Sequence, residues 1–447
     1  MDMPKTKNSK YVDELKELLS IPSISAQSAH KKDMEKAANW LIDKLKSLNF
    51  KTRIMPTGGH PVVYTENLEA GKSKPTVLVY GHYDVQAPDP LEEWLSDPFK
   101  PEVRDGNIYA RGAADDKGQL FTWVAAVEEL LQKSELPVNI KFFIEGEEEI
   151  GSANLETFVK KNKKLLASDI CVISDSHSLD KTTPVITYGL RGLVYTEINI
   201  RALAKDVHSG GYGGNVLNPA NVLSQVIAQL KDKNHKVLIP GFYESVRKIS
   251  ANERSVLEKF PFRKKEVMSE TGAKEVVGER EFSVQLRAGA RPTLDVNGMW
   301  GGYTGEGPKT IIPAEASAKI SMRLVPKQDP KKIYQAFKDY VQSLLPTGVD
   351  YKCKLLSLDE PIIMDTSSRY FEKAENAFKK TFGKKPLYEL SGGSIPVTAM
   401  LKQNLNLDSI LMGYGLPDDG LHSPNEKLSL EMFEKGIQTN VNFLTSL

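Results

Sequence analysis

The sequence predicts an α/β protein in which a mixed, mostly parallel sheet is flanked by helices and a smaller α+β domain is inserted. Three observations support this fold class. Short apolar runs alternate with amphipathic stretches up to about residue 190, strictly alternating strands replace them afterwards, and the earlier pattern returns near the C-terminus. At 447 residues the chain is also too long for one ordinary core.

Two amphipathic helices are expected first, at residues 11–19 and 34–48, because apolar side chains recur there every three or four positions. Four apolar runs then follow, with helices expected at 119–131 and 155–166: PVVYT (61–65), TVLVYGHYDV (76–85), NIKFFIEG (139–146) and DICVISD (169–175). Such runs form the buried strands of parallel sheets, which bind ligands at the carboxyl ends of their strands.

The pattern changes near Tyr188. Half-exposed strands are expected in VYTEINIRA, TLDVNGMWGG and SAKISMRLVP, a turn in the Gly-rich HSGGYGGNVLNP, and helices at 220–230 and 331–345. The Lys- and Glu-rich stretch at 247–280 reads as a solvated helical face. From about Ser367 helices and strands alternate again. We therefore expect residues 1–190 and 360–447 to form one domain, and residues 191–359 an inserted α+β domain.

Composition excludes several classes of partner. The formal net charge is +1, from 59 basic and 58 acidic residues, so no net field would attract nucleic acid or an anionic membrane. Cys171 and Cys353 are expected to be free thiols in a reducing compartment. The N-terminal stretch lacks the apolar core of a secretory signal, and no run approaches a membrane span, so a cytoplasmic location is expected.

Five side chains of the kind that bind metals follow separate strand-end signals: His82, Asp115, Glu149, Asp175 and His422. Two imidazoles and three carboxylates can hold two divalent ions if one carboxylate bridges them. Glu148, beside Glu149, is a candidate general base. The combination indicates a hydrolase.

Each motif also has an ordinary explanation. His82 and Asp84 share one face of a strand, so Asp84 can orient the imidazole, but the pair could simply end a core strand. The three acids of EGEEEIGS repel one another unless cations neutralise them, although an exposed acidic turn is the alternative. His177 is a rival ligand near Asp175.

The chain resembles the dinuclear zinc metallopeptidases of the carnosinase, aminoacylase and carboxypeptidase G type, and looks closest to the carnosinase-like cytosolic nonspecific dipeptidases. The resemblance runs from about Leu15 to the C-terminus. The blocks that carry it are WLSDPFKPEVRDGNIYARGAADDKGQ, EGEEEIGS, VHSGGYGGNVLNP, KTIIPAEASAKISMRLVP, SGGSIPVT and DDGLHSPNEK. It implies a phosphorylase/hydrolase-like catalytic domain and an inserted lid that also forms a homodimer.

The resemblance also implies a role for individual residues. Asp115 would bridge two ions, expected to be zinc with manganese or cobalt as alternatives, and the Asp115–Asp116 peptide would be cis. His82 and Asp175 would complete one site, and Glu149 and His422 the other. Glu148 would be the general base, and Asp84 would accept a hydrogen bond from His82 and orient it. His208 from the partner subunit would stabilise the oxyanion, and the substrate carboxylate would be bound by Thr310, Arg323 and Ser394.

The implied reaction is hydrolysis of the amide bond of a dipeptide or short peptide with a free C-terminal carboxylate, by a metal-bridging water that Glu148 deprotonates. A carboxypeptidase or an N-acyl-amino-acid deacylase is the alternative within hydrolases. The carboxypeptidase-like branch often has Asn where this chain has Thr310, which favours the dipeptidase. A non-catalytic protein that binds small carboxylates would need no base, and a structural zinc protein would need more thiolates.

Overall fold

The computed structural model describes residues 9–133, 136–261 and 264–447, without the side chain of residue 270. The chain divides into two compact units. The first unit comprises the residues up to Tyr188, Met364–Tyr388 and Pro396–Leu447. The second comprises Gly189–Ile363 and also Glu389–Ile395, a short segment that the periodicity of the sequence does not set apart.

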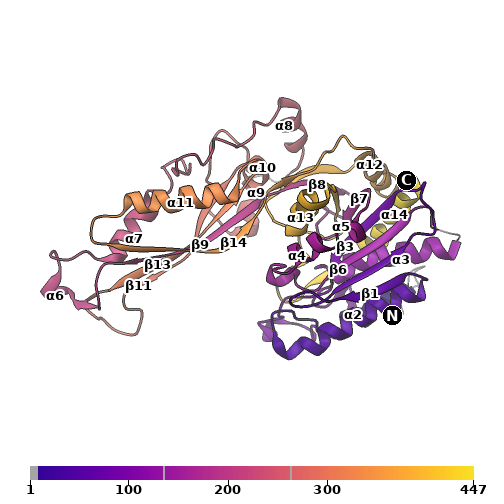
Figure 1. The fold of residues 1–447 in the computed structure, drawn as a ribbon, viewed down its shortest axis with the longest axis horizontal. Coiled ribbons are helices and arrows are strands. Elements are labelled where there is room, and N and C mark those ends of the chain that lie inside the picture. Colours follow the sequence, from indigo (N-terminus) through magenta and orange to yellow (C-terminus); the bar gives the residue numbers. More distant parts are fainter. Residues whose placement is uncertain (1–8, 134–135, 262–263) are drawn as a thin grey trace. The chain divides into compact units, whose positions relative to one another are not determined.

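The first unit is built on a large mixed sheet (Figure 1). Its strands run in the order β1 (Lys51–Met55), β2 (Val62–Asn67), β6 (Asn139–Glu145), β3 (Thr76–His82), β7 (Ile170–Ile173), β17 (Ser409–Met412) and β8 (Val185–Leu190). Strand β8 also pairs with β15 (Ile362–Ile363) and β16 (Leu387–Ser391).

Only the centre of this sheet is parallel. β3 runs parallel to β6 and β7, and β17 runs parallel to β7, whereas β1, β2, β8 and β15 pair antiparallel. The expectation of a mostly parallel sheet is therefore wrong at both edges. The loop from β1 to β2 is too short for a crossover, so these strands must be antiparallel.

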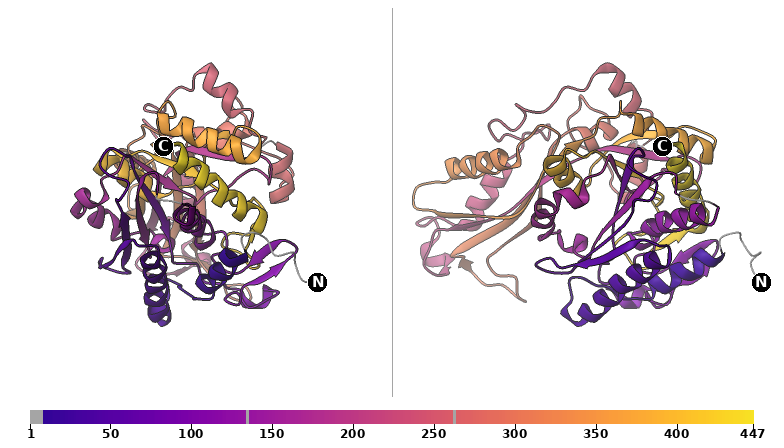
Figure 2. Two further views of the ribbon diagram at one scale, coloured as in Figure 1. Left: turned by 90° about the vertical axis from the view of Figure 1, so that its right-hand side faces the viewer. Right: turned by 45° about the vertical axis from the view of Figure 1, so that its right-hand side comes forward.

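Helices cover both faces of this sheet (Figures 1 and 2). They are α1 (Ser9–Leu19), α2 (Lys31–Ser47), α3 (Lys117–Lys133), α4 (Leu155–Lys161), α5 (Lys163–Leu166), α12 (Arg369–Phe382), α13 (Pro396–Leu405) and α14 (Leu430–Ser446). Helix α3 packs against α1, α14 and β3, and nearly all of its side chains as far as Glu128 are buried. It is therefore the central helix of this unit, and its first turn directly follows Asp115 and Asp116.

Smaller elements complete the first unit. A three-stranded sheet is formed by β18 (Lys427–Ser429), β5 (Asn107–Tyr109) and β4 (Glu102–Arg104). Three single turns of 3₁₀-helix occur at η1 (Ser28–His30), η2 (Leu91–Glu93) and η3 (Glu148–Ile150). Since β18 is close in sequence to His422 and β5 to Asp115, the small sheet joins two segments that carry predicted ligands.

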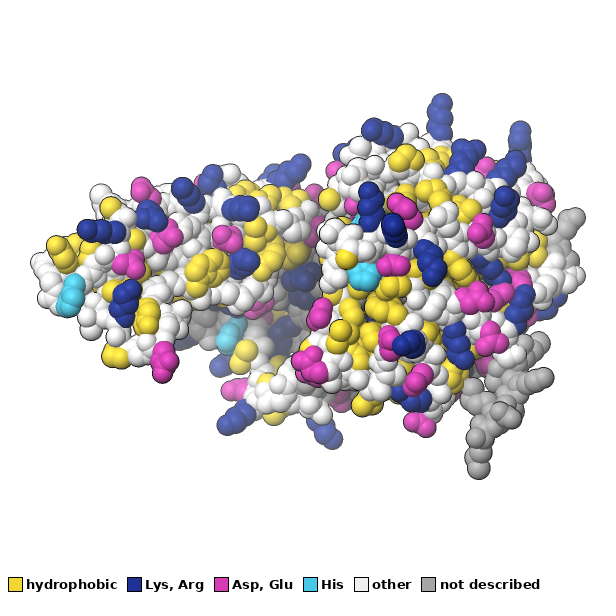
Figure 3. Space-filling model, turned by 90° about the horizontal axis from the view of Figure 1, so that it is seen from below, with side chains coloured by type: hydrophobic (Ala, Val, Ile, Leu, Met, Phe, Trp, Pro, Cys, Tyr) yellow, Lys and Arg dark blue, Asp and Glu magenta, His cyan; other side chains and the backbone are white. Residues whose placement is uncertain are grey.

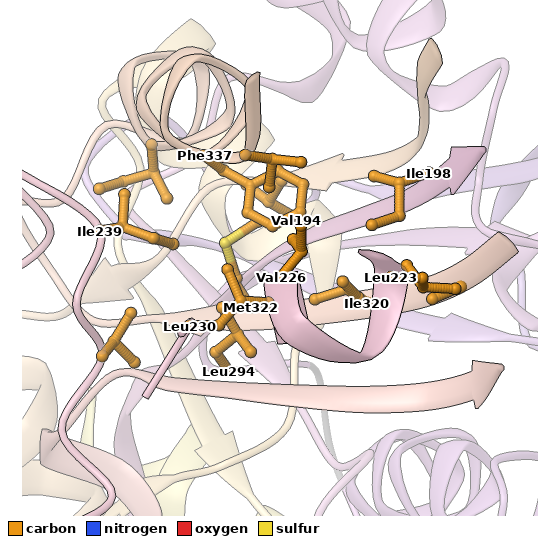
Figure 4. Close-up of a cluster of buried hydrophobic side chains, with 14 of the residues drawn as sticks. Val194, Ile198, Leu223, Val226, Leu230, Ile239, Leu294, Ile320, Met322 and Phe337 are labelled. Atoms are coloured by element: carbon orange, nitrogen blue, oxygen red, sulfur yellow. The ribbon is translucent and has the colours of Figure 1, made fainter. Parts of the chain in front are cut away.

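The second unit contains an antiparallel sheet in the order β11 (Thr293–Gly301), β13 (Glu315–Leu324), β9 (Gly192–Arg201) and β14 (Asp350–Asp359). Every second residue of β9 is buried, which is the pattern of a sheet with one covered face. Helices α7 (Pro219–Ala228) and α11 (Pro330–Leu344) cover that face. Figure 4 shows Val226 of α7 and Phe337 of α11 packed against Ile320 of the sheet.

Helix boundaries in the second unit follow local signals. Asn218 and Asp329 cap α7 and α11 through their side chains, and a proline occupies the next position in each helix. The Gly-rich segment expected as a turn instead forms β10 (Val207–His208) and the short helix α6 (Ser209–Tyr212), and β10 pairs with β12 (Ile311–Ile312). The remaining helices are α8 (Ala251–Leu257), α9 (Lys264–Thr271) and α10 (Val284–Ala290).

The molecular surface agrees with the balanced composition. Figure 3 shows basic and acidic side chains interspersed on the visible face. None of the helices in the described part of the chain is long and apolar enough to cross a membrane.

Candidate metal centre

Two groups of three side chains converge at the carboxyl edge of the central strands of the first unit. One group is His82, Asp115 and Asp175, and the other is Asp115, Glu149 and His422. Within each group the donor atoms lie within 4.8 Å of one another. Asp115 belongs to both groups, so its two carboxylate oxygens lie between two sets of donors. The structure thus brings together all five side chains that the sequence singled out as ligands.

In the first group, His82 ends β3, Asp175 follows β7, and Asp115 lies in the loop before α3; His82 and Asp115 are buried and Asp175 is partly exposed. The Nε2 atom of His82 lies 3.1 Å from Oδ1 of Asp115 and 4.0 Å from Oδ2 of Asp175. Its Nδ1 atom lies 3.1 Å from the main-chain oxygen of Asp84 and 3.4 Å from the Asp84 carboxylate. Since Nδ1 faces acceptors of Asp84, it keeps a proton in both charge states of the ring, and Nε2 is the nitrogen that would become available to a metal ion.

The second group forms the exposed side of the centre. The Nε2 atom of His422 lies 2.9 Å from Oδ2 of Asp115 and 3.2 Å from Oε2 of Glu149. The side chain of His422 is 56% exposed, whereas those of Asp115 and Glu149 are nearly buried. The centre is therefore reached from the side of His422.

The single helical turn η3 carries Glu148 next to Glu149. The Asp84 carboxylate accepts hydrogen bonds from the main-chain N–H groups of both residues, at 3.3 Å and 3.1 Å. Asp84 thus ties the end of β3 to the turn that bears the candidate base and one ligand. Gln86 assists by donating to the Glu149 carboxylate at 2.9 Å.

The charges in the cluster are unbalanced. Burial, and then the neighbouring charge of Asp115, raises the pKa of Asp175 to about 7, and burial raises the pKa of Glu148 well above its usual range. Although burial opposes it, hydrogen bonds from His422 and His82 hold the pKa of Asp115 below its usual range. The hydrogen bonds that His422 donates to Asp115 and Glu149 raise its own pKa to about 10.

These shifts show how the cluster behaves without cations. Six carboxylates share the centre with two imidazoles: Asp84, Asp115, Asp116, Glu148, Glu149 and Asp175. Burial raises the pKa values of Asp116, Glu148 and Asp175 and so favours their neutral forms when no cation is present. Two divalent ions would relieve that repulsion. Nitrogen and carboxylate oxygen are the donors that Zn²⁺, Mn²⁺ and Co²⁺ accept. The donor set therefore fits a pair of such ions.

The loop that presents Asp115 is held by a carboxylate that sequence reasoning missed. Glu426 is fully buried. One of its oxygens accepts from Arg111 Nη1 at 2.7 Å and from the N–H of Gly112 at 2.9 Å, and the other accepts from the N–H groups of Ala114 and Asp115 at 2.8 Å and 3.1 Å. The peptide between Asp115 and the next residue is cis, as the resemblance implies.

A second buried side chain connects this loop with a more distant one. Gln119 donates to the main-chain oxygen of Ala114 at 2.7 Å and accepts from the N–H groups of Tyr414 and Gly415. In the sequence, Glu426 and Gln119 are marked only as polar residues that lie close to motifs carrying candidate ligands. That signal does not distinguish a buried hydrogen-bonding group from a solvated one.

The other histidine beside Asp175 is not part of either group. His177 instead forms a main-chain β-bridge with Gly415. In the part of the chain that the structure describes, the two groups named above are the only sets of three or more such side chains placed to hold an ion.

The expected substrate residues all lie in the second unit, where they form two separate pairs. The Oγ1 atom of Thr310 is 3.4 Å from Nε2 of His208, and Nη1 of Arg323 donates to Oγ of Ser394 at 3.0 Å. His208 and Ser394 thus belong to different pairs, one at each end of β13.

The register of the sheet sets the distance between these pairs. Arg323 lies opposite Leu193 near the start of β9, whereas Glu315 lies opposite Arg201 at its end, and β10 and β12 follow beyond that end. Figure 1 shows α6, which begins next to His208, beyond the same end. The eight steps along β13 from Glu315 to Arg323 alone span roughly 27 Å.

Comparisons with known proteins agree with this architecture. The model of peptidase family M20/M25/M40 matches residues 78–446. The chain is 32% identical to the Cys-Gly metallodipeptidase dug1 of Schizosaccharomyces pombe over 99% of this chain and 96% of that protein. It is 29% identical to the human Beta-Ala-His dipeptidase, with 98% and 90% covered. Among solved structures, the M20 family metallo-carboxypeptidase Sso-CP2 from Sulfolobus solfataricus superposes with a TM-score of 0.89 at 34% identity, covering 98% of this chain and 99% of that one.

The Glu426 contacts generate a first prediction. In Glu426→Gln, the amide NH₂ would face main-chain N–H groups that need an acceptor, so the Asp115 loop should lose its fixed position. We expect metal affinity to fall about 10- to 100-fold, as for other residues that orient ligands. Titration of metal-free protein against a chelating indicator measures this.

The matched control is Glu431→Gln, since Glu431 is 52% exposed and pairs only with lysines of the surface. Its metal affinity should equal that of the unchanged protein. Unchanged metal binding in Glu426→Gln, with only a lower melting temperature, would contradict the role of Glu426 in ligand placement.

Proposed function

The chain belongs to peptidase family M20/M25/M40, and on that premise we propose that it is a metal-dependent dipeptidase that cleaves dipeptides or short peptides with a free C-terminal carboxylate. One observation carries the proposal: two donor groups share Asp115, and Glu148, which belongs to neither group, is close enough for the charges of His82, Asp175 and Asp115 to shift its pKa. A site that only bound metal would not need this additional half-buried acid.

Two divalent ions are the proposed cofactor, with zinc as the metal and manganese or cobalt as alternatives. His82 and Asp175 would hold one ion, Glu149 and His422 the other, and Asp115 both. Bound there, the ions would lower the pKa of a water molecule and polarise the peptide carbonyl.

Glu148 is proposed as the general base and acid. Its burial favours the neutral carboxyl group, so it can take a proton from water and hold it until the leaving amine needs it. Asp84 supports this role because it hydrogen-bonds the main chain of Glu148 and so fixes the turn.

Recognition of the substrate is assigned to the second unit. Arg323 and Ser394 are proposed to bind the C-terminal carboxylate, for which a guanidinium supplies paired donors. His208 is proposed to stabilise the oxyanion, with Thr310 beside it as a further carboxylate ligand. A dipeptide spans at most about 7 Å, so the two pairs of one chain are too far apart to contact the same dipeptide.

This separation favours a homodimer in which His208 acts in the site of the partner. The edge strand β11 offers a surface for it. Val296, Met299 and Trp300 of this strand are exposed, and among the described residues β11 pairs only with β13. An exposed apolar edge strand favours pairing with another strand, and a second copy of this chain is the proposed partner.

A cytoplasmic location is proposed because neither cysteine forms a disulfide. Cys171 is buried and Cys353 half-buried, and both are free thiols, as is typical of proteins from reducing compartments. Neither nucleic acid nor a membrane is proposed as a partner, because the net charge is +1.

The second candidate function is a carboxypeptidase. The similarity to Sso-CP2, at 34% identity over 98% of the chain, favours it specifically. An N-acyl-amino-acid deacylase would use the same centre and the same carboxylate ligands. A non-catalytic protein that binds small carboxylates stays the remote alternative.

A substrate panel separates these functions. With zinc- or manganese-loaded protein, we expect free-amine dipeptides to be hydrolysed with kcat/KM at least tenfold above blocked tripeptides and N-acetyl amino acids. Release of amino acids, followed by chromatography, measures this. Preference for blocked longer peptides would establish the carboxypeptidase instead, and preference for N-acetyl amino acids the deacylase.

The proposed base gives a further prediction. Glu148→Gln should retain both ions, since Glu148 is not among the five donors, and should lower kcat by about 10²- to 10⁴-fold. Metal analysis and steady-state kinetics measure both. Glu147→Gln is the matched control, because Glu147 adjoins Glu148 but is bonded to Asn154. Near-normal turnover in Glu148→Gln would remove it as the base.

Action in trans predicts complementation between two inactive variants. Mixed Glu148→Gln and His208→Ala proteins should form heterodimers in which one of the two sites is intact. After random exchange of equal amounts, about half of the dimers are heterodimers, and one of the two sites in each is intact. About a quarter of full activity should therefore return. Absence of recovery after verified exchange of subunits would show that His208 acts within its own chain.

A further inference from the structure

A second arginine lies close to Arg323 in the second unit. Arg323 is opposite Leu193 in the sheet, and Arg191 precedes Leu193 by two residues. The even-numbered residues of β9 face the hydrophobic core, so Leu193 and Arg191 share the opposite face with Arg323. Both arginines are half-buried. They are therefore neighbours on the face of the sheet that no helix of the core covers.

One loop joins the two arginines. Ser394 accepts a hydrogen bond from Nη1 of Arg323 at 3.0 Å and donates one to the main-chain oxygen of Arg191 at 2.6 Å. The Nε atom of Arg191 donates to the oxygen of Gly392 at 3.1 Å. These bonds use only one side-chain N–H group of each arginine, so each guanidinium keeps further donors.

Gly392 lies directly against the guanidinium of Arg191. A Cβ atom built on Gly392 would lie 2.6 Å from Nη2 of Arg191 and 3.0 Å from the main-chain oxygen of Ala288. A side chain at this position would have to displace the Arg191 guanidinium or press against the Ala288 oxygen, so glycine lets the loop lie close to the arginine. The hydrogen bond from Nε of Arg191 to Gly392 then orients the guanidinium.

The two positive charges lack a direct counterion. Within the described residues, no carboxylate oxygen lies within 4 Å of a nitrogen of either guanidinium. The nearby Asp295 is already paired with Lys231 at 3.4 Å, and Asp359 accepts from a serine hydroxyl. Burial and the charge of Arg323 lower the pKa of Arg191 to about 10. Two half-buried cations that repel each other form a site for an anion.

We propose that Arg191 and Arg323 together bind the C-terminal carboxylate of the peptide substrate, so that Arg191 is a second specificity-determining arginine of the same site. The inference rests on the proposed dipeptidase function. Each arginine offers one edge of its guanidinium to the carboxylate, and Ser394 fixes the spacing between them. With two cations against one carboxylate, the site rejects peptides whose C-terminus is an uncharged amide.

Binding to an inactive, metal-loaded protein tests this without turnover. In the Glu148→Gln background, calorimetry compares a dipeptide with the same dipeptide carrying a C-terminal amide. Adding Arg191→Gln should weaken binding of the dipeptide with a free carboxylate about 10- to 100-fold, because a hydrogen bond between two charged groups is lost. Binding of the dipeptide amide should change less than about threefold, because it makes no such bond. Arg191→Lys should give an intermediate loss.

The matched control is Arg254→Gln, which removes an exposed arginine of α8 that pairs with Glu258. It should leave both affinities unchanged. If Arg191→Gln weakens both ligands equally, Arg191 merely holds the loop, and the proposal is overturned; unchanged binding of both overturns it too. Should Arg191→Gln not fold, Arg191→Lys alone decides between these outcomes.

Kinetics distinguish failure of this inference from failure of the proposed function. In the otherwise unchanged enzyme, Arg191→Lys should raise KM for dipeptides by about 3- to 10-fold, in line with its intermediate loss of binding, while kcat changes less than threefold. If the wild-type protein hydrolyses no dipeptide, the proposed function fails. In that case the ratio of the affinities for the dipeptide and for its C-terminal amide still tests whether the two arginines bind a carboxylate.

Discussion

Crowding of negative charge at the carboxyl ends of the parallel central strands is the constraint on which the remaining structure depends. Six carboxylates and two imidazoles occupy the carboxyl ends of β3, β6 and β7 and the loops beside them. Burial there makes each negative charge costly, as the raised pKa of Asp175 indicates. Such a cluster is stable only with cations or bound protons, and it needs a rigid frame to keep the carboxylates in place.

Much of the surrounding polar network provides that frame. Asp84 holds the turn of Glu148 and Glu149, and Glu426 holds the loop of Asp115. Both use carboxylate oxygens to accept main-chain N–H groups, so they fix the backbone and leave the ligand side chains free. Gln119 adds a third support by joining the Asp115 loop to the segment after β17. Placement of the ligands is thus a property of buried hydrogen bonds rather than of packing alone.

The second unit carries a complementary excess of positive charge. Arg191 and Arg323 lie near each other without an ion-pair partner in the described chain, and the Ser394 loop spaces them. The other pair, His208 and Thr310, lies beyond the far end of the same sheet. A short peptide cannot reach both ends of the sheet. The proposed binding of one peptide by both pairs therefore requires residues from two chains.

The sequence by itself predicted the donor side chains of the candidate centre and the strand ends that carry them. His82, Glu149 and Asp175 follow apolar runs directly, and such runs report local structure because strand formation and burial depend on neighbouring residues. It also identified the interrupted α/β architecture, but not the antiparallel edges of the large sheet.

Tertiary structure alone decided how distant segments support one another. Glu426 lies 311 residues from Asp115, and Ser394 lies 203 residues from Arg191, so no local pattern marks either contact. A buried glutamate that accepts four hydrogen bonds and a solvated one look alike in a sequence. Their roles depend on which backbone groups the fold brings within about 3 Å.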